Sequence, residues 1–133
     1  MSLNIIHEQD VKGDQYTGEF SREIKHLSAP WTLGSQNVWV GVINYEPHCT
    51  SNMHSHDIQE EVFYCISGSG EVIVGEEKNE LKPGTCVYVP PKSLHQIINN
   101  TDQVLKVLSA VSPAFEPSQY AKDHKLNEGD KND

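Results

Sequence analysis

The chain of 133 residues has no apolar run that approaches the roughly 20 residues of a membrane-spanning helix. Its first ten residues also lack the apolar core of a secretory signal peptide, so we expect a cytoplasmic protein. Basic residues are scarce as well, with 10 Lys and Arg against 19 Asp and Glu and a formal net charge of −9. This balance argues against nucleic acid and anionic membranes as partners, because both attract basic surfaces.

Paired cysteines are absent too. The three cysteines, Cys49, Cys65 and Cys86, are an odd number without the spacing of a disulfide framework. Cys65 and Cys86 lie within apolar strand patterns, and we expect both to pack as small hydrophobic residues.

The body of the chain shows neither helical periodicity nor an internal repeat, but short alternating segments separated by turn residues. The expected strands cover residues 21–27, 38–43, 50–56, 61–67, 71–74, 79–81, 85–89, 93–98 and 103–111. Many short strands at intervals of about 8–12 residues predict a single all-β domain, either a sandwich or a barrel. We expect residues 36–113 to form it, with Phe115 packed on its surface, residues 118–124 as a helical turn and the polar tail 114–133 largely flexible.

Histidine and glutamate residues form the most informative pattern in the chain. His54 and His56 are two residues apart in a segment that we expect to be a strand, so both imidazoles face the same side. Glu61 opens the next apolar strand on its inward face, whereas Glu60 falls on the opposite face. His95 lies in a third strand. A carboxylate on an apolar inward face is unfavourable without a partner, and a cation supplies one. The four residues His54, His56, Glu61 and His95 therefore predict a transition-metal site.

The same residues resemble the two motifs of the cupin superfamily, in particular its small single-domain members. The first motif reads His54-x-His56-x4-Glu61-x6-Gly68, with His48 where a leading glycine is usual. The second reads Gly84-x5-Pro90-x-Lys92-x2-His95-x3-Asn99, with Lys92 in place of a glycine. The resemblance covers about residues 37–112. It implies a double-stranded β-helix (jelly-roll) barrel, a divalent metal held by the four residues above, and a homodimer. Residues 1–35 would supply an accessory strand or an arm exchanged within the dimer.

The two departures from the motifs carry their own expectations. A residue that replaces glycine at a position with positive φ is strained by about 1 kcal/mol. Lys92 would either hold an anionic substrate over the barrel mouth or be an ordinary solvated lysine. His48 would be a donor to the metal ligands or have no role in the site.

The reaction is not stated by these residues. Three imidazoles and one carboxylate suit Fe, Mn, Ni, Zn or Cu equally. Open coordination positions would serve a dioxygenase, an isomerase or epimerase, or a lyase, with Tyr45, Tyr88, His48 and Lys92 as candidate acids or bases. The alternatives are a non-catalytic protein that binds or senses a sugar or organic acid through the metal, and a purely structural metal-stabilised barrel.

Overall fold

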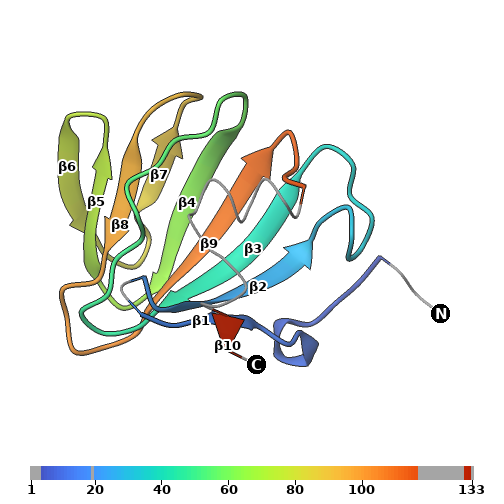
Figure 1. The fold of residues 1–133 in the computed structure, drawn as a ribbon, viewed down its shortest axis with the longest axis horizontal. Coiled ribbons are helices and arrows are strands. Elements are labelled where there is room, and N and C mark those ends of the chain that lie inside the picture. Colours follow the sequence, from blue (N-terminus) through green and yellow to red (C-terminus); the bar gives the residue numbers. More distant parts are fainter. Residues whose placement is uncertain (1–3, 19, 117–130, 133) are drawn as a thin grey trace.

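The computed structural model describes residues 4–18, 20–116 and 131–132. It has two antiparallel sheets that face each other (Figure 1). The larger sheet has the strand order β10-β1-β2-β3-β9-β4-β7, and the smaller one has the order β6-β5-β8. This is the predicted all-β jelly-roll barrel.

The strand bounds, in chain order, are as follows. The larger sheet contains β1 (Asp14–Tyr16), β2 (Arg22–Ser28), β3 (Trp39–Tyr45), β4 (Glu60–Ser67), β7 (Cys86–Val89), β9 (Leu105–Ser112) and β10 (Lys131–Asn132). The smaller sheet contains β5 (Gly70–Val74), β6 (Glu77–Leu81) and β8 (His95–Ile98). A single 3-10 turn, η1 (Glu8–Asp10), precedes β1, and no helix of the described residues is long and apolar enough to cross a membrane.

Alternation along β4 places its side chains as the sequence predicts. Glu61, Phe63 and Cys65 are buried between the sheets, while Val62 and Tyr64 point outward. Among the described residues no second layer covers the outward face of β4, because Tyr64 is 44% exposed. The inward face is therefore the one that builds the site.

The outward face also explains an incorrect expectation about the cysteines. Cys65 is buried as predicted, but Cys86 is exposed. Cys86 pairs in register with the outward-facing Tyr64, and Val87 and Val89 take the inward positions of β7. The apolar residues around Cys86 alternate, so only half of them contribute to the core.

The turn between β4 and β5 depends on glycine. Gly68 has φ +79°, and a Cβ atom there would lie 2.3 Å from the carbonyl oxygen of Val104. Only glycine fits both constraints without moving the backbone. The predicted turn at Lys82 to Gly84 is also present, with Thr85 N–H donating to the Lys82 carbonyl at 2.9 Å.

The segment from residue 50 to residue 56 is not the continuous strand that we expected. Its ladder pairing with β8 consists of isolated bridges, Thr50 to Ile98 and His54 to His95. Between them the Ser51 hydroxyl, rather than a carbonyl, accepts the Ile97 N–H at 3.0 Å. Side-chain hydrogen bonds of this kind compete with the backbone ladder, so the segment lies along the smaller sheet without regular pairing.

The ends of the chain extend the larger sheet. β1 and β2 come from the N-terminal 35 residues, and β10 pairs with β1. Glu8, in the segment before β1, contacts this sheet through two lysines. Its carboxylate lies 2.8 Å from Lys106 Nζ, and its backbone carbonyl accepts a hydrogen bond from Lys25 Nζ. Phe115 is fully buried. The expected helical turn at residues 118–124 lies outside the described residues.

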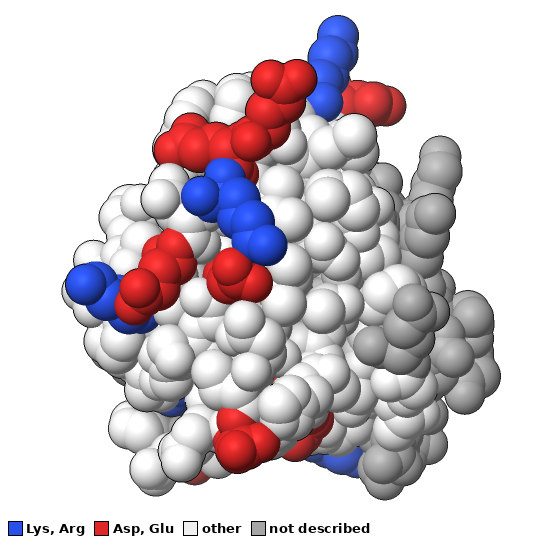
Figure 2. Space-filling model, turned by 90° about the vertical axis from the view of Figure 1, so that its left-hand side faces the viewer, with Lys and Arg blue, Asp and Glu red and all other residues white. Residues whose placement is uncertain are grey.

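Charge on the outside is mixed in sign. Figure 2 faces the side of the molecule where β6 lies and shows acidic and basic side chains next to one another. Within this region Lys78 Nζ lies 3.5 Å from a Glu71 carboxylate oxygen. Exposed pairs of this kind stabilise a fold only slightly. Such surface charges affect the solubility of a protein, and they do not contribute to the interior in which the histidines lie.

Candidate metal centre

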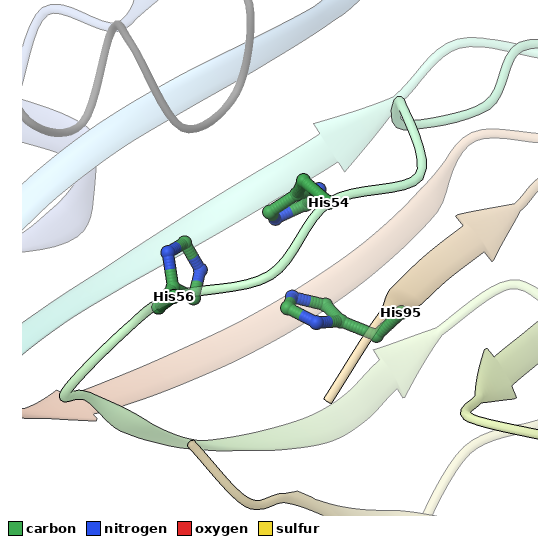
Figure 3. Close-up of side chains that lie close together, drawn as sticks. All are labelled: His54, His56 and His95. Atoms are coloured by element: carbon green, nitrogen blue, oxygen red, sulfur yellow. The ribbon is translucent and has the colours of Figure 1, made fainter. Parts of the chain in front are cut away.

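Three imidazoles converge between the two sheets. His54 and His56 come from the irregular segment before β4, and His95 is the first residue of β8 (Figure 3). One nitrogen from each ring lies within 4.8 Å of the others. All three side chains are buried. The sequence-predicted histidines thus meet in one place, although two of them are not on a strand.

Glu61 completes the cluster from the larger sheet. Its Oε1 atom lies 3.3 Å from His56 Nε2 and 3.3 Å from His95 Nε2. Ligand atoms that share one transition-metal ion at about 2.1 Å are about 3–3.5 Å from each other. The distances at Glu61 are therefore those of neighbouring ligands around a single ion.

Backbone carbonyls orient two of the rings. His54 Nδ1 lies 2.8 Å from the Asn52 carbonyl oxygen, and His95 Nδ1 lies 3.0 Å from that of Ser93. A carbonyl oxygen only accepts, so each Nδ1 carries the proton and each Nε2 presents a lone pair to the interior. Hydrogen bonds of this type fix the tautomer and orientation of metal-binding histidines.

Ser109 orients the carboxylate, and the sequence analysis missed it. Its hydroxyl donates to Glu61 Oε2 at 2.6 Å, which leaves Oε1 to face the histidines. Ser109 lies on the inward face of β9 between Val107 and Val111. A lone hydroxyl among inward apolar residues was the signal in the sequence that would have identified it.

The electrostatics of the cluster keep these groups in the forms that bind metals. Burial by itself raises the pKa of Glu61, but the neighbouring His56 and His95 outweigh it and hold that pKa well below its usual range. Burial, with a further contribution from His95, lowers the pKa of His54 to about 3. A charged carboxylate and a neutral imidazole are the forms that a metal requires.

The buried polar atoms of the cluster are suited to a bound cation. His95 Nε2 and Glu61 Oε1 are both buried and neither makes a hydrogen bond. When protonated, His56 and His95 partner the Glu61 carboxylate and lower its pKa. When neutral, His95 turns a lone pair toward Glu61 Oε1 at 3.3 Å, so that the two atoms repel each other and the buried carboxylate charge has no partner. A divalent ion between them would remove both penalties, so the donor set and its geometry suit such an ion.

Other candidate residues lie elsewhere. Glu60 is on the outer face, where its carboxylate accepts a hydrogen bond from Tyr88 at 3.0 Å, so alternation separated Glu60 from Glu61 as predicted. His48 is exposed and lies 2.6 Å from Asp102. Tyr45 is buried, and burial together with Glu61 raises its pKa, against an opposing effect of Arg22. Of the four candidate acids and bases, Tyr45 is the one that shares the interior with Glu61.

Both departures from the motifs have the predicted backbone geometry. His48 has φ 58° and Lys92 has φ 69°, the left-handed region that glycine adopts most easily. The N–H of Lys92 donates to the carbonyl of His56 at 2.7 Å. Lys92 therefore supports a histidine of the cluster through its backbone. Its side chain is exposed.

Comparison with known proteins agrees with this arrangement. The cupin domain family matches residues 41–111, which include all four clustered residues. The chain belongs to the cupin family. An uncharacterised protein of Methanocaldococcus jannaschii is 36% identical over 63 residues, which are 47% of this cupin and 50% of that protein.

Two relatives have assigned activities. Glucose-6-phosphate isomerase of Thermococcus litoralis is 35% identical over 72 residues, 50% of this cupin and 37% of the isomerase. Pectin degradation protein KdgF of Dickeya dadantii is 25% identical over 81 residues, 61% of this cupin and 71% of KdgF. The cupin thus spans half of the Methanocaldococcus protein and little more than a third of the isomerase.

A solved structure shows the same fold. The sugar phosphate isomerase from a cupin superfamily of Silicibacter pomeroyi superposes with a TM-score of 0.66 at 19% identity. The superposition covers 81% of this cupin and 74% of that chain. At this level of identity it shows the architecture of the barrel and not its chemistry.

Proposed function

We propose that this cupin binds one divalent transition-metal ion through His54, His56, Glu61 and His95, and that it uses the ion as a small-molecule enzyme. The observation that carries the proposal is the buried 3.3 Å approach of Glu61 Oε1 to two imidazole nitrogens, which a cation explains. Among the reactions open to such a site, we favour isomerisation or epimerisation of a sugar-like substrate. Dioxygenase and lyase chemistry are the other members of the same proposal.

The similarity to glucose-6-phosphate isomerase and to KdgF supports this preference. The bound ion would act as a Lewis acid that polarises a carbonyl or hydroxyl oxygen of the substrate. The chain itself supplies two further functions. Ser109 and the Nδ1–H bonds keep the ligand atoms pointed inward, and burial of the ligands excludes water from their surroundings.

Tyr45 is the proton-carrying group that we assign to this interior. Burial keeps its phenol protonated, so it would donate a hydrogen bond to substrate oxygen and not act as a base. Such a hydrogen bond would hold the substrate in place in the interior that Tyr45 shares with Glu61. Replacement of Tyr45 by Phe would therefore lower turnover while metal content stays the same.

A non-catalytic protein that holds a sugar or organic acid through the ion is the second candidate. One observation favours it: all four ligands are nearly fully buried, with His54 the most exposed at 7%. A site this enclosed suits retention of a ligand more than rapid exchange of substrate and product.

Elemental analysis of protein purified without chelator tests the metal. We expect about one ion per chain, and loss of it in His56→Ala and His95→Ala. His48→Ala is the matched control, because His48 is exposed and bonded to Asp102. Equal metal content in His56→Ala and in the control would show that the four residues are not the ligands.

The identity of the ion then directs the assay. Iron would call for oxygen-uptake measurements with small acids and phenols, and manganese, zinc, nickel or copper for NMR detection of sugar isomerisation. Turnover by the wild type that is absent in Glu61→Ala, whichever of these metals is added, would support the enzyme. Tight binding of a sugar or organic acid without turnover would support the non-catalytic binding protein.

We also propose a homodimer. The outward apolar side chains of β4, Val62, Tyr64 and Ile66, offer a surface for a second copy. Light scattering coupled to size-exclusion chromatography distinguishes a monomer from a dimer. Tyr64→Lys should shift a dimer toward monomer, whereas Lys78→Ala at β6 should not.

A further inference from the structure

The chain contains one arginine, and it is buried inside the barrel. Arg22 is the first residue of β2, and its side chain is 1% exposed. It pairs in register with Tyr45 on β3, which in turn pairs with Leu105 on β9. Arg22 and Tyr45 therefore lie side by side on the inward face of the larger sheet, which also carries Glu61.

The contacts of Arg22 are incomplete. Its Nη1 donates to the Phe20 carbonyl at 2.9 Å, but Nη2 is buried and makes no hydrogen bond. No carboxylate of the described residues lies within ion-pairing distance of it. The guanidinium is charged at every pH at which proteins fold, so its charge cannot be relieved by losing a proton.

The charges nearby do not supply the missing acceptor. Among the described residues, Glu61 is the carboxylate that acts on Tyr45, and its oxygens already face Ser109 and the histidines. Tyr45, the immediate neighbour, is held as a neutral phenol by burial. A buried cation with two unused N–H donors beside a phenol O–H is the donor pattern that a carboxylate requires.

The overall charge of the loaded interior points the same way. Arg22 carries +1, Glu61 carries −1, and the divalent ion of the proposed function adds +2. The three histidines add nothing as neutral ligands. A positive remainder in a water-poor interior selects anionic molecules over neutral ones.

We propose that Arg22 and Tyr45 form an anion subsite inside the barrel, which takes the carboxylate of a small organic acid and so makes sugar acids or hydroxy acids the substrate class. Arg22 Nη2 and the Tyr45 hydroxyl would hold the carboxylate while the remainder of the molecule reaches toward the histidine cluster. This deepens the proposed function and rests on it for the chemistry, but the subsite itself exists without the metal. Arg22 is a binding residue here and takes no part in bond breaking.

Because the chain has a single arginine, its guanidinium can be observed alone. Protein labelled with 15N-arginine gives one set of side-chain NMR signals, and metal-free protein is titrated with glycolate, with its neutral isostere glycolamide, and with chloride. We expect a saturable shift of the Arg22 signal with glycolate and none with glycolamide. A signal that glycolate leaves in place, or that chloride moves equally, would overturn the proposal.

Chemical modification provides a second readout on the same residue. Phenylglyoxal reacts with guanidinium groups, so mass spectrometry of the peptide that contains Arg22 reports the modification of this residue. We expect glycolate to slow the modification and glycolamide to leave its rate unchanged. Equal rates with both compounds would contradict an anion subsite at Arg22.

A substitution separates charge from geometry. Arg22→Lys keeps the charge but loses the planar pair of donors, and we expect glycolate to bind the metal-loaded variant at least about tenfold more weakly, the loss typical of one charge-assisted hydrogen bond. Its metal content should equal that of the wild type. If the variant fails to fold, the two wild-type measurements still decide the matter. Failure of metal binding with a responsive Arg22 signal would refute the proposed function and leave the subsite standing.

Discussion

At the residue scale, two side chains occupy backbone conformations that favour glycine. Lys92 has φ 69° and still donates its N–H to the His56 carbonyl. Lys92→Gly should stabilise the protein by about 1 kcal/mol, because glycine adopts this conformation without the steric penalty of a Cβ atom. Urea unfolding followed by circular dichroism measures the change.

The matched control for this prediction is Lys92→Ala. Alanine removes the charge but keeps the Cβ atom, so its stability should stay close to that of the wild type. Equal stabilisation by alanine and glycine would mean that the lysine charge, and not the backbone, is the source of strain.

A second prediction concerns the serine that orients Glu61. Ser109→Ala removes the 2.6 Å hydrogen bond to Oε2, and the carboxylate then loses its fixed direction. Loss of such a supporting contact weakens metal affinity by about 10–100-fold. Competition with a coloured chelator measures the affinity. Ser112→Ala on the same strand is the control, because Ser112 donates to the Asn37 carbonyl away from the site.

A third prediction concerns stability at high pH. Burial raises the pKa of Tyr45 above its ordinary value of 10.0. Above about pH 10 the unfolded chain releases this proton while the folded chain keeps it, so Tyr45 makes the free energy of unfolding fall as the pH rises. In Tyr45→Phe the decrease should be shallower. The exposed Tyr64→Phe should keep the wild-type slope, and identical slopes in all three proteins would contradict the assignment.

At the element scale, strands with one buried face were the predictable ones. In β4 and β9 inward apolar residues alternate with outward ones, and a shift of one residue would expose the entire core face. The same alternation assigned Glu61 to the interior and Glu60 to the surface. The sequence therefore contained enough information to bring the carboxylate and the histidines together.

The segment of residues 50–56 was not predictable by this reasoning. The Ser51 hydroxyl takes the place of a backbone carbonyl as the acceptor for the Ile97 N–H. Ile97 is distant in sequence, so local periodicity does not predict this hydrogen bond. The role of Arg22 was hidden for a related reason. Its burial depends on β2 joining the larger sheet beside Tyr45, a long-range pairing that local periodicity does not contain.

A further prediction concerns Phe115, which packs in the core beside the histidine cluster. Its ring centroid lies 5.4 Å from that of Trp39 and 5.0 Å from that of His56. Phe115→Ala should destabilise the protein by about 3–5 kcal/mol because it opens a cavity in the core. Urea unfolding is again the measurement. Ile58→Ala, at a position 65% exposed, should change stability by much less.

At the scale of the whole molecule, stability and metal content should be linked. An ion that binds only the folded protein at a free concentration of about 1,000 times its Kd adds about 4 kcal/mol to the free energy of unfolding. Chelator should therefore lower the melting temperature of the wild type. It should have no effect on His95→Ala, and a chelator effect of equal size in both proteins would contradict a site at His95.

The histidine cluster joins parts of the chain that are distant in sequence. Glu61 belongs to the larger sheet and His95 to the smaller one, so an ion between them would act as a clasp across the barrel. Like a disulfide, a clasp that closes a long loop restricts the unfolded chain. Loss of the ion would then be coupled to separation of the sheets, and slow exchange is the expected consequence. The metal found in a purified sample would record which ion was at hand while the chain folded, ahead of the intrinsic order of affinities.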